Sequence, residues 1–264
     1  MKLARQEKIS YLQPDWAKDF TVAAGFTTRN GGVSRAPFNS LNLGFNTEDH
    51  KSNVEGNRST LSRAFGIPPH QLLTVKQVHG TDLLIIDEVN PDLTHFLGLE
   101  CDAIVTNQPN IMIGILVADC YPVILCDPVQ RVVAAVHVGW RGAAGGILGR
   151  ALTAMRENFN VMMHDVRSAV GPGIGGHLYE VDRPVREAFR KGAGFWDQCS
   201  REVGLGKWHL DLREACRLQL LNAGLEARQI DIATECTCCH KELFYSYRRD
   251  KGQTGRQLGF IMQD

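Results

Sequence analysis

Two side chains, Cys120 and His137, are the strongest candidates for chemistry in this sequence, because a thiol and an imidazole flank one turn. The runs 111–126 and 131–137 are rich in β-branched residues and surround the turn-forming tetrapeptide 127–130. This pattern predicts a two-stranded hairpin. With the middle of the tetrapeptide at the tip, Cys120 faces His137. Directly opposed side chains have Cβ atoms about 4.5–5.5 Å apart, close enough for one metal ion to bind both.

The neighbours of this pair favour a functional role over a structural one. A cysteine in an apolar strand is usually a small buried hydrophobe, and a histidine at a strand end often only bonds a carbonyl. Here Asp119 precedes the thiol, and Gly139-Trp140-Arg141-Gly142 follows the imidazole. Small and polar residues at strand ends let a ligand approach the backbone closely. The pair is therefore a candidate metal or catalytic site.

The elements that must position the pair are short strands and helices in mixed order. Periodic apolar residues predict a helix over 143–159, just after the imidazole. Its free N–H groups and dipole would favour a bound phosphate. Another helix is predicted over 52–65, with an S-x-x-E capping box, and a hairpin of strands 243–248 and 256–262 near the end. No clean βαβ repeat occurs, which argues against a dinucleotide-binding fold.

Composition narrows the class of protein. The chain has 264 residues and no linker-like tract, which favours one domain. Lys plus Arg and Asp plus Glu both total 29, and no basic stripe with interleaved aromatics is present, so nucleic-acid binding is not expected. The apolar runs are shorter than the roughly 20 residues of a membrane helix, and the first residues do not resemble a signal peptide. We expect a cytoplasmic protein without membrane contact.

The eight cysteines are scattered rather than spaced as a disulfide framework, so we expect them to be reduced. One cluster stands out, Cys236-Thr237-Cys238-Cys239-His240. No second ligand pair follows it at the spacing of a zinc finger. The sequence alone therefore predicts neither a structural metal site nor a redox pair there.

A further set of motifs runs in order through nearly the whole chain. They are GFTTR at 25–29, GGVS at 31–34, SLNLG at 40–44, NR at 57–58, QVHG at 77–80, DA at 102–103, ADC at 118–120, HVGWRG at 137–142, GP at 171–172, YEV at 179–181, SYRR at 246–249 and TGR at 254–256. Together they resemble the laccase-domain or YfiH-like family, also called polyphenol oxidases and later assigned as purine nucleoside phosphorylases.

The resemblance implies a fold, a metal and a set of substrates. The fold is α+β, a single domain over 1–264 with mixed β-sheets layered between helices, and the interspersed strands and helices are compatible with it. In the family, the residues matching His79, Cys120 and His137 bind one metal ion, usually read as zinc, with copper as the alternative. The implied partners are phosphate and a purine nucleoside: adenosine, inosine or methylthioadenosine. Gly173 departs from relatives that often carry a cysteine there.

Two histidines and one cysteine leave a fourth position of a tetrahedral ion open, which is typical of catalytic zinc. Such an ion lowers the pKa of its bound water to about 7, and that chemistry suits the deamination of adenosine. Phosphorolysis needs in addition a bound phosphate and a proton donor for the departing purine.

Four further residues are assigned to the substrates as a hypothesis. Arg58 and Arg141, the latter with the helix start after it, would hold phosphate, while Asn42 and Arg29 would shape the nucleoside pocket. A metal-bound histidine usually needs an acceptor for its other ring nitrogen, and Asp119 or Asp102 is a candidate for that role or for moving a proton.

Three other functions stay open. One is a cysteine hydrolase, or an enzyme that edits peptidoglycan precursors, with Cys120 as nucleophile and His137 or His79 as base. Another is a copper-dependent polyphenol oxidase, which is less favoured because none of the nine histidines forms a His-x-His pair. A binding module without activity is the least favoured, because reactive side chains are dense.

Overall fold

The computed structural model describes residues 1–192 and 195–264. Two six-stranded sheets form its centre. In spatial order the first contains β1 (Lys2–Gln6), β2 (Ile9–Gln13), β3 (Val22–Thr27), β15 (Gln257–Gln263), β7 (Met112–Val117) and β4 (Leu72–Thr74). The second contains β14 (Ile230–Ile232), β10 (Arg167–Val170), β8 (Tyr121–Asp127), β9 (Val132–Val138), β6 (Ala103–Thr106) and β5 (Leu83–Ile86).

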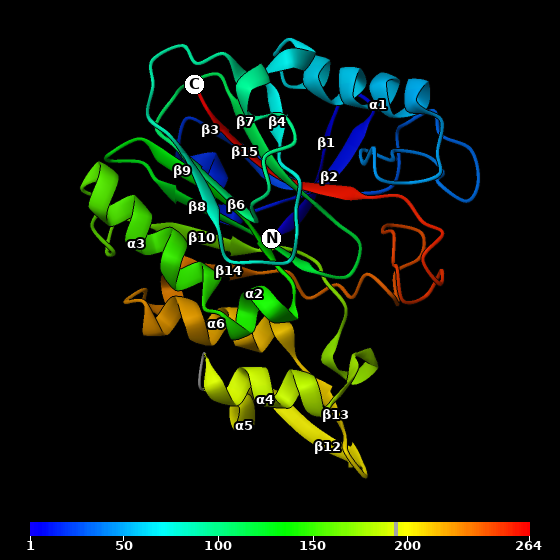
Figure 1. The fold of residues 1–264 in the computed structure, drawn as a ribbon. Coiled ribbons are helices and arrows are strands. Elements are labelled where there is room, and N and C mark those ends of the chain that lie inside the picture. Colours follow the sequence, from blue (N-terminus) through cyan, green and yellow to red (C-terminus); the bar gives the residue numbers. More distant parts are fainter. Residues whose placement is uncertain (193–194) are drawn as a thin grey trace.

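Helices cover the outer faces of both sheets (Figure 1). Helix α1 (Lys51–Ala64) covers the first sheet, and α2 (Trp140–Ala144), α3 (Ile147–Phe159) and α6 (Leu212–Asn222) cover the second. Helices α4 (Arg183–Lys191) and α5 (Trp196–Cys199) pack outside α2 and α6. A small third sheet of β11 (Glu180–Asp182), β13 (Lys207–Leu210) and β12 (Ser200–Gly204) lies beside α4 and α5. None of the helices in the described part of the chain has the length and apolar character that a membrane span requires.

Alternating side chains of the strands divide the core into layers. On β8, Val123 packs with the apolar residues of α3 and α6, whereas Ile124 packs between the two sheets with Ile113 and Ile261. Successive strand residues point to opposite faces, so both faces of β8 are buried. A third cluster fills the space between the first sheet and α1. Parallel and antiparallel pairs occur in both sheets, so the predicted α+β fold with mixed sheets layered between helices is confirmed.

The central hairpin forms, but its predicted register is wrong by two residues. The Asp127 carboxylate accepts hydrogen bonds from two N–H groups of the turn, at 2.7 and 3.1 Å, which lengthens the loop to residues 128–131. Asp127 consequently pairs with Val132, and Pro122, not Cys120, faces His137. Aspartate side chains often accept hydrogen bonds from the backbone two residues along and so mimic a backbone turn.

The run 111–126 is also not one strand, because the chain leaves the first sheet after β7 and enters the second at β8. Asp119 lies in this crossover with a φ of 92°. Its carboxylate accepts hydrogen bonds from the Thr237 hydroxyl and the Arg248 N–H, both at 2.7 Å. These bonds hold a backbone conformation that side chains other than glycine rarely adopt. Cys120 follows at once, so the crossover and not strand pairing places its thiol.

Two helix predictions need correction at their starts. The helix predicted over 143–159 is two helices, α2 and α3, separated at Gly146, whose φ is +73°. Helix α1 begins after His50 without a side-chain cap, so the predicted capping box is absent. The residue that anchors this start is Asp49, which accepts hydrogen bonds from the His50 N–H and the Asn53 amide, both at 2.9 Å.

The predicted strand 243–248 does not form, although its partner 256–262 is confirmed as β15. The Gln257 side chain accepts a hydrogen bond from the Tyr245 N–H at 2.9 Å and donates one to the Tyr245 carbonyl at 3.2 Å. Both backbone groups that a neighbouring strand would use are therefore occupied. The segment is an irregular loop in which three consecutive residues, 244–246, are buried.

Candidate metal centre

Three side chains from three different segments converge at one end of the second sheet. His79 lies in the loop between β4 and β5, Cys120 in the crossover, and His137 in β9. Their ligand atoms all lie within 4.8 Å of one another, and the two imidazole rings are nearly perpendicular, with centroids 4.7 Å apart. Two imidazoles and a thiolate suit zinc and also copper. The predicted convergence of the three residues is thus present, by a route that the hairpin argument did not foresee.

A glycine keeps the space between the ligands open. A Cβ atom at Gly139 would lie 2.9 Å from Cδ2 of His79 and 3.4 Å from Sγ of Cys120. The first distance is too short for any real contact between a Cβ and a ring carbon. A side chain here would push His79 out of the group, so the local sequence fits a bound ion.

One carboxylate, that of Asp102, orients two of the three ligands. Its Oδ1 is 2.7 Å from Nδ1 of His137 and also accepts the N–H of His79 at 2.9 Å, while Oδ2 accepts the N–H groups of Gly80 at 2.6 Å and Val78 at 3.2 Å. The Nε2 atom of His137 is left for a metal. The backbone bonds fix the loop at His79, whose φ is +60°. Of the two acids considered, Asp102 therefore supports the ligands, and Asp119 fixes the crossover.

The thiol of Cys120 and the imidazole of His137 favour each other's charged form. Burial raises the pKa of Cys120, but the charge of His137 and hydrogen bonds from both imidazoles outweigh it and lower the pKa to about 6. Burial lowers the pKa of His137, but the Cys120 thiolate and Asp102 raise it to about 9. Both shifts favour a thiolate beside an imidazolium. A thiolate is the form that binds metals or attacks a carbon atom.

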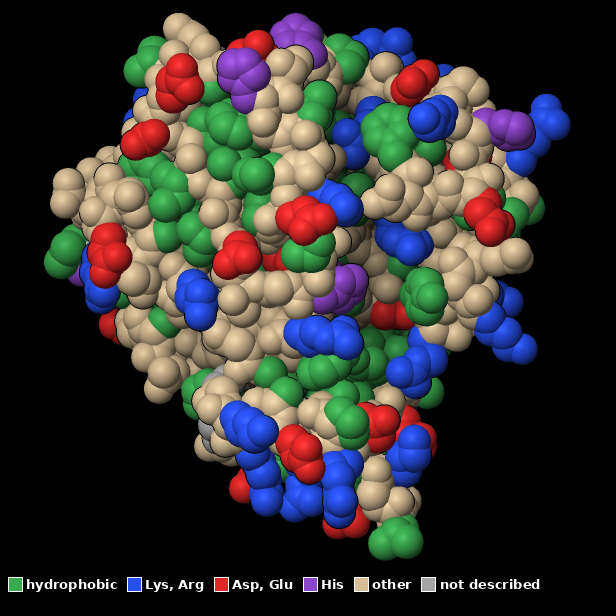
Figure 2. All heavy atoms as spheres, viewed as in Figure 1, with side chains coloured by type: hydrophobic (Ala, Val, Ile, Leu, Met, Phe, Trp, Pro, Cys, Tyr) green, Lys and Arg blue, Asp and Glu red, His purple; other side chains and the backbone are tan. Residues whose placement is uncertain are grey.

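Cationic and phenolic side chains surround this centre. Burial raises the pKa of the Tyr179 hydroxyl; the Cys120 charge raises it further, whereas Arg248 and Arg141 lower it. Burial also lowers the pKa of Arg256, and the Cys120 charge raises it. Tyr179 and Arg256 are therefore close enough to Cys120 to be influenced by its charge. Figure 2 shows basic side chains around a hollow where histidine and acidic side chains also lie. Tyr179, Arg248 and Arg256 were not assigned from the sequence, although each lies in one of its motifs.

Arg58, one of the two residues predicted to hold phosphate, carries a charge that no carboxylate in the described part of the chain pairs with at 4 Å. It donates hydrogen bonds to the Leu43 carbonyl at 3.0 Å and the Thr74 hydroxyl at 2.8 Å, and it lies over the Phe45 ring. Burial lowers its pKa to about 10. The Leu43 N–H in turn donates to the carbonyl of Arg256, so the segment at Leu43 connects both cations.

Arg141, the other predicted phosphate ligand, is exposed and lies over the Trp140 ring at 4.3 Å. The five-residue helix α2 that carries it is too short to supply the expected dipole. This part of the sequence argument is corrected, and only the guanidinium charge of Arg141 is left to attract an anion.

Asn42 and Arg29, the residues predicted to shape the nucleoside pocket, are both engaged with other loops. The Asn42 amide donates to the Thr47 hydroxyl at 2.9 Å, and its oxygen accepts the Arg256 N–H at 2.9 Å. Arg29 donates to the Asn39 carbonyl at 2.7 Å and lies over the Tyr245 ring. Their bonds fix loop shape, and the role of these loops in nucleoside binding stays a prediction.

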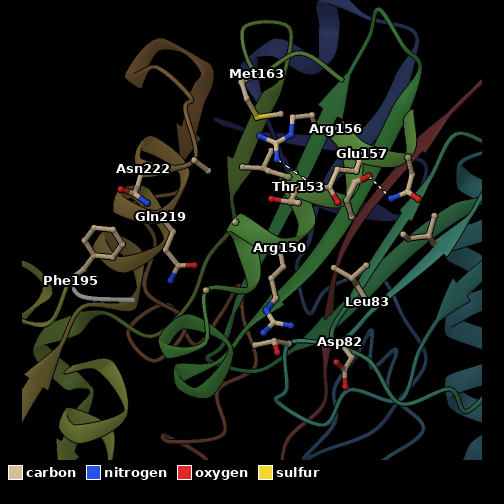
Figure 3. A pocket seen from close by; sticks show the side chains of 18 residues that line it. Asp82, Leu83, Arg150, Thr153, Arg156, Glu157, Met163, Phe195, Gln219 and Asn222 are labelled. Carbon is tan, nitrogen blue, oxygen red and sulfur yellow. Dashed lines mark hydrogen bonds and ion pairs between the residues drawn. The ribbon is translucent and has the colours of Figure 1, made fainter. Parts of the chain in front are cut away.

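A separate cavity of about 900 Å³ is lined mainly by residues of β5, α3 and α6 (Figure 3). Asp82, Arg150 and Gln219 line it, together with apolar residues. None of the three candidate ligands lines this cavity. We therefore do not assign the metal chemistry to this cavity, although it is large.

Comparison with known proteins agrees with the motifs and the fold. Residues 23–264 match the family described as multi-copper polyphenol oxidoreductase laccase. The chain belongs to this family. A curated member from Escherichia coli, the purine nucleoside phosphorylase YfiH, is 36% identical, with 95% of this chain and 97% of that protein covered. A member from Deinococcus radiodurans, also named purine nucleoside phosphorylase, is 39% identical, with 93% and 90% covered.

Solved structures of family members have the same fold. The crystal structure of the Bacillus licheniformis hypothetical protein YfiH superimposes with a TM-score of 0.90 at 32% identity, covering 98% of both chains. That of YlmD from Geobacillus stearothermophilus also gives 0.90, covering 98% of this chain and 97% of that one. The single-domain α+β fold of this family is therefore the fold of this chain.

Proposed function

We propose that residues 1–264 form one cytoplasmic, zinc-dependent purine nucleoside phosphorylase that also deaminates adenosine. Its substrates would be adenosine, inosine and methylthioadenosine, with phosphate as the second substrate. The observation that carries this proposal is the convergence of His79, Cys120 and His137 within 4.8 Å of one another, next to cationic side chains. The names of the curated relatives supply the reaction class.

A zinc or copper ion held by the three ligands would act as a Lewis acid at the reacting purine. The protein itself supplies orientation. Asp102 fixes the tautomer and ring position of His137 through the 2.7 Å contact. Tyr179 keeps its proton at neutral pH, and burial raises its pKa further, so its hydroxyl would be available as a hydrogen-bond donor to the purine.

The phosphate would be bound by Arg58 and Arg141, with Arg256 and Arg248 adding positive charge nearby. Planar guanidinium groups bind phosphate through paired hydrogen bonds. Arg58 suits this role because it is held in place by two neutral oxygen acceptors and keeps its charge at pH 7. A fixed, unneutralised cation gains more from an anion than a mobile exposed one does.

The test is an adenosine assay that resolves adenine from inosine, run with and without phosphate. Adenine release should require phosphate, whereas inosine formation should not. Conversion of His79, Cys120 and His137 singly to alanine should remove bound metal and both activities. His164→Ala, at an exposed histidine outside the site, is the control. Unchanged metal content and turnover in folded ligand variants would show the assignment to be wrong.

A cysteine hydrolase is the second candidate, favoured by the Cys120 thiolate beside the His137 imidazolium. It would act on an amide such as a peptidoglycan-precursor peptide, without a metal. Mass spectrometry of metal-free protein with such a substrate distinguishes the two. A covalent adduct on Cys120 supports the hydrolase, and turnover that needs zinc without any adduct supports the phosphorylase.

A further inference from the structure

A second group of soft metal-binding side chains gathers between the turn 236–239 and the loop 171–177. Cys236 forms a parallel bridge with Gly173, and its Sγ accepts the Gly175 N–H at 3.1 Å. The Cys239 N–H donates to the Cys236 carbonyl at 3.1 Å, so the two cysteines are the first and last residues of one β-turn. Across the gap, Nε2 of His177 is 3.7 Å from Sγ of Cys239.

The distances within this group match those between ligands of one ion. Zn–S bonds of about 2.3 Å and Zn–N bonds of about 2.0 Å at a tetrahedral angle place sulfur and nitrogen about 3.5 Å apart, against 3.7 Å here. The turn bond from the Cys239 N–H to the Cys236 carbonyl at 3.1 Å keeps the two cysteines close in the fold. Cysteines separated by two residues are a common metal-binding pair.

Gly175 leaves room between these donors, as Gly139 does at the first centre. A Cβ atom at Gly175 would lie 2.9 Å from Nδ1 of His177 and 3.4 Å from Sγ of Cys236. The three donor atoms are not yet all within 4.8 Å of one another. The His177 side chain is exposed, and rotation of an exposed ring between rotamers costs little. On ion binding, we expect the ring of His177 to move toward Cys236.

We propose that Cys236, Cys239 and His177 form a second site for a thiophilic metal ion, zinc(II) or copper(I). On binding, both thiols release their protons to solvent and the sulfur atoms donate to the ion, with no change of oxidation state. The Gly175 N–H bond to Cys236 supports the thiolate, as outer hydrogen bonds do for metal ligands. Cys239 and His177 are exposed while Cys236 is buried, so the ion enters from solvent and can exchange.

Asp119 connects this second site to the first centre. Thr237, within the turn, donates its hydroxyl hydrogen bond to Asp119 at 2.7 Å, and Asp119 precedes the ligand Cys120. The Asp119 carbonyl also accepts the Ile174 N–H at 2.9 Å. Both segments of the second site thus contact the crossover. The proposal does not depend on the reaction catalysed at the first centre.

The experiment counts ions on the intact protein by native mass spectrometry after reduction and titration with zinc, and separately with copper(I) under a reductant. The wild type should bind two ions. Cys239→Ala and His177→Ala, both at exposed positions, should bind the second ion at least about tenfold more weakly and keep adenosine turnover. Cys238→Ala, in the same turn, is the matched control and should keep both ions.

A wild-type protein that binds only one ion in the zinc titration and only one ion in the copper(I) titration would overturn the proposal. So would a second ion that both variants keep, or one that only Cys238→Ala removes. Isolation of the reduced protein with a rapidly re-forming Cys236–Cys239 disulfide and no second ion would assign the pair to redox chemistry instead. Uptake of copper(I) alone, or of zinc alone, supports the site and identifies its ion. The number of bound ions decides the test, whatever the adenosine turnover of a variant.

Discussion

Substitution of Asp102 by asparagine tests whether one carboxylate assembles the metal centre. Asparagine keeps an oxygen that can face His137 and the His79 N–H, but it places an NH₂ group where Oδ2 accepts the N–H groups of Gly80 and Val78 at 2.6 and 3.2 Å. The two backbone N–H donors of Gly80 and Val78 then face the NH₂ donor of the asparagine. Asp102 is fully buried, so water cannot relieve the conflict.

The size of the effect can be worked from these contacts. A hydrogen bond to a charged group contributes about 1.5–3 kcal/mol, and one of the two bonds lost is short while the other is long. We therefore expect a loss of about 3 kcal/mol in the free energy of unfolding, which lowers Tm by about 6–12 °C. The neutral partner also makes His137 a weaker ligand, which costs about 10- to 100-fold in metal affinity.

Differential scanning calorimetry of the metal-free protein measures the first effect, and competition with a zinc chelator measures the second. Asp82→Asn is the matched control, because Asp82 is exposed and lies three residues from His79. It should leave both quantities unchanged. If folded Asp102→Asn protein binds zinc within twofold of the wild type, the carboxylate does not orient the ligands and the reasoning fails.

Three further results are expected. In metal-free protein, the pKa of Cys120 is lowered to about 6, so its alkylation by iodoacetamide should level off above about pH 7 and be half-maximal near pH 6; a midpoint near pH 9 would contradict the lowered pKa. Gly139→Ala places a Cβ 2.9 Å from the His79 ring and should reduce bound metal, whereas Gly149→Ala, within α3 and with open space around it, should keep the metal and stabilise the fold by about 0.5–1 kcal/mol. Arg58→Gln should raise the KM for phosphate about tenfold or more in adenine release while inosine formation is retained; equal losses in both reactions would argue against a phosphate role.

The sequence identified the three converging side chains better than the geometry that brings them together. Residue types identified Cys120 and His137, and the resemblance added His79. Regular elements followed from periodicity, for example β15 and the main part of α3. These predictions succeed because they depend on local alternation and helical spacing, which the surrounding fold does not override.

The geometry depended on contacts that local patterns do not contain. The register of the central hairpin was set by the Asp127 side chain, which occupies backbone N–H groups of the turn. The position of Cys120 was set by Asp119, whose partners Thr237 and Arg248 are distant in sequence. A slip of two residues keeps every side chain on its own face of the sheet, so the hydrophobic pattern is equally satisfied by both registers. Binary pattern therefore could not have chosen between them.

The two candidate metal sites differ in how far the sequence could reveal them, and the reason is chain separation. A zinc finger is visible in a sequence because all its ligands lie within one short segment. Here His177 approaches Cys239 from 62 residues away. The available local signal is weaker: a glycine lies close to a donor residue at both sites, Gly139 after His137 and Gly175 before His177. A glycine is favoured where donor side chains crowd the backbone, as His79 and Cys120 do at Gly139 and as His177 and Cys236 do at Gly175, because a Cβ atom would fill the space that the ion needs.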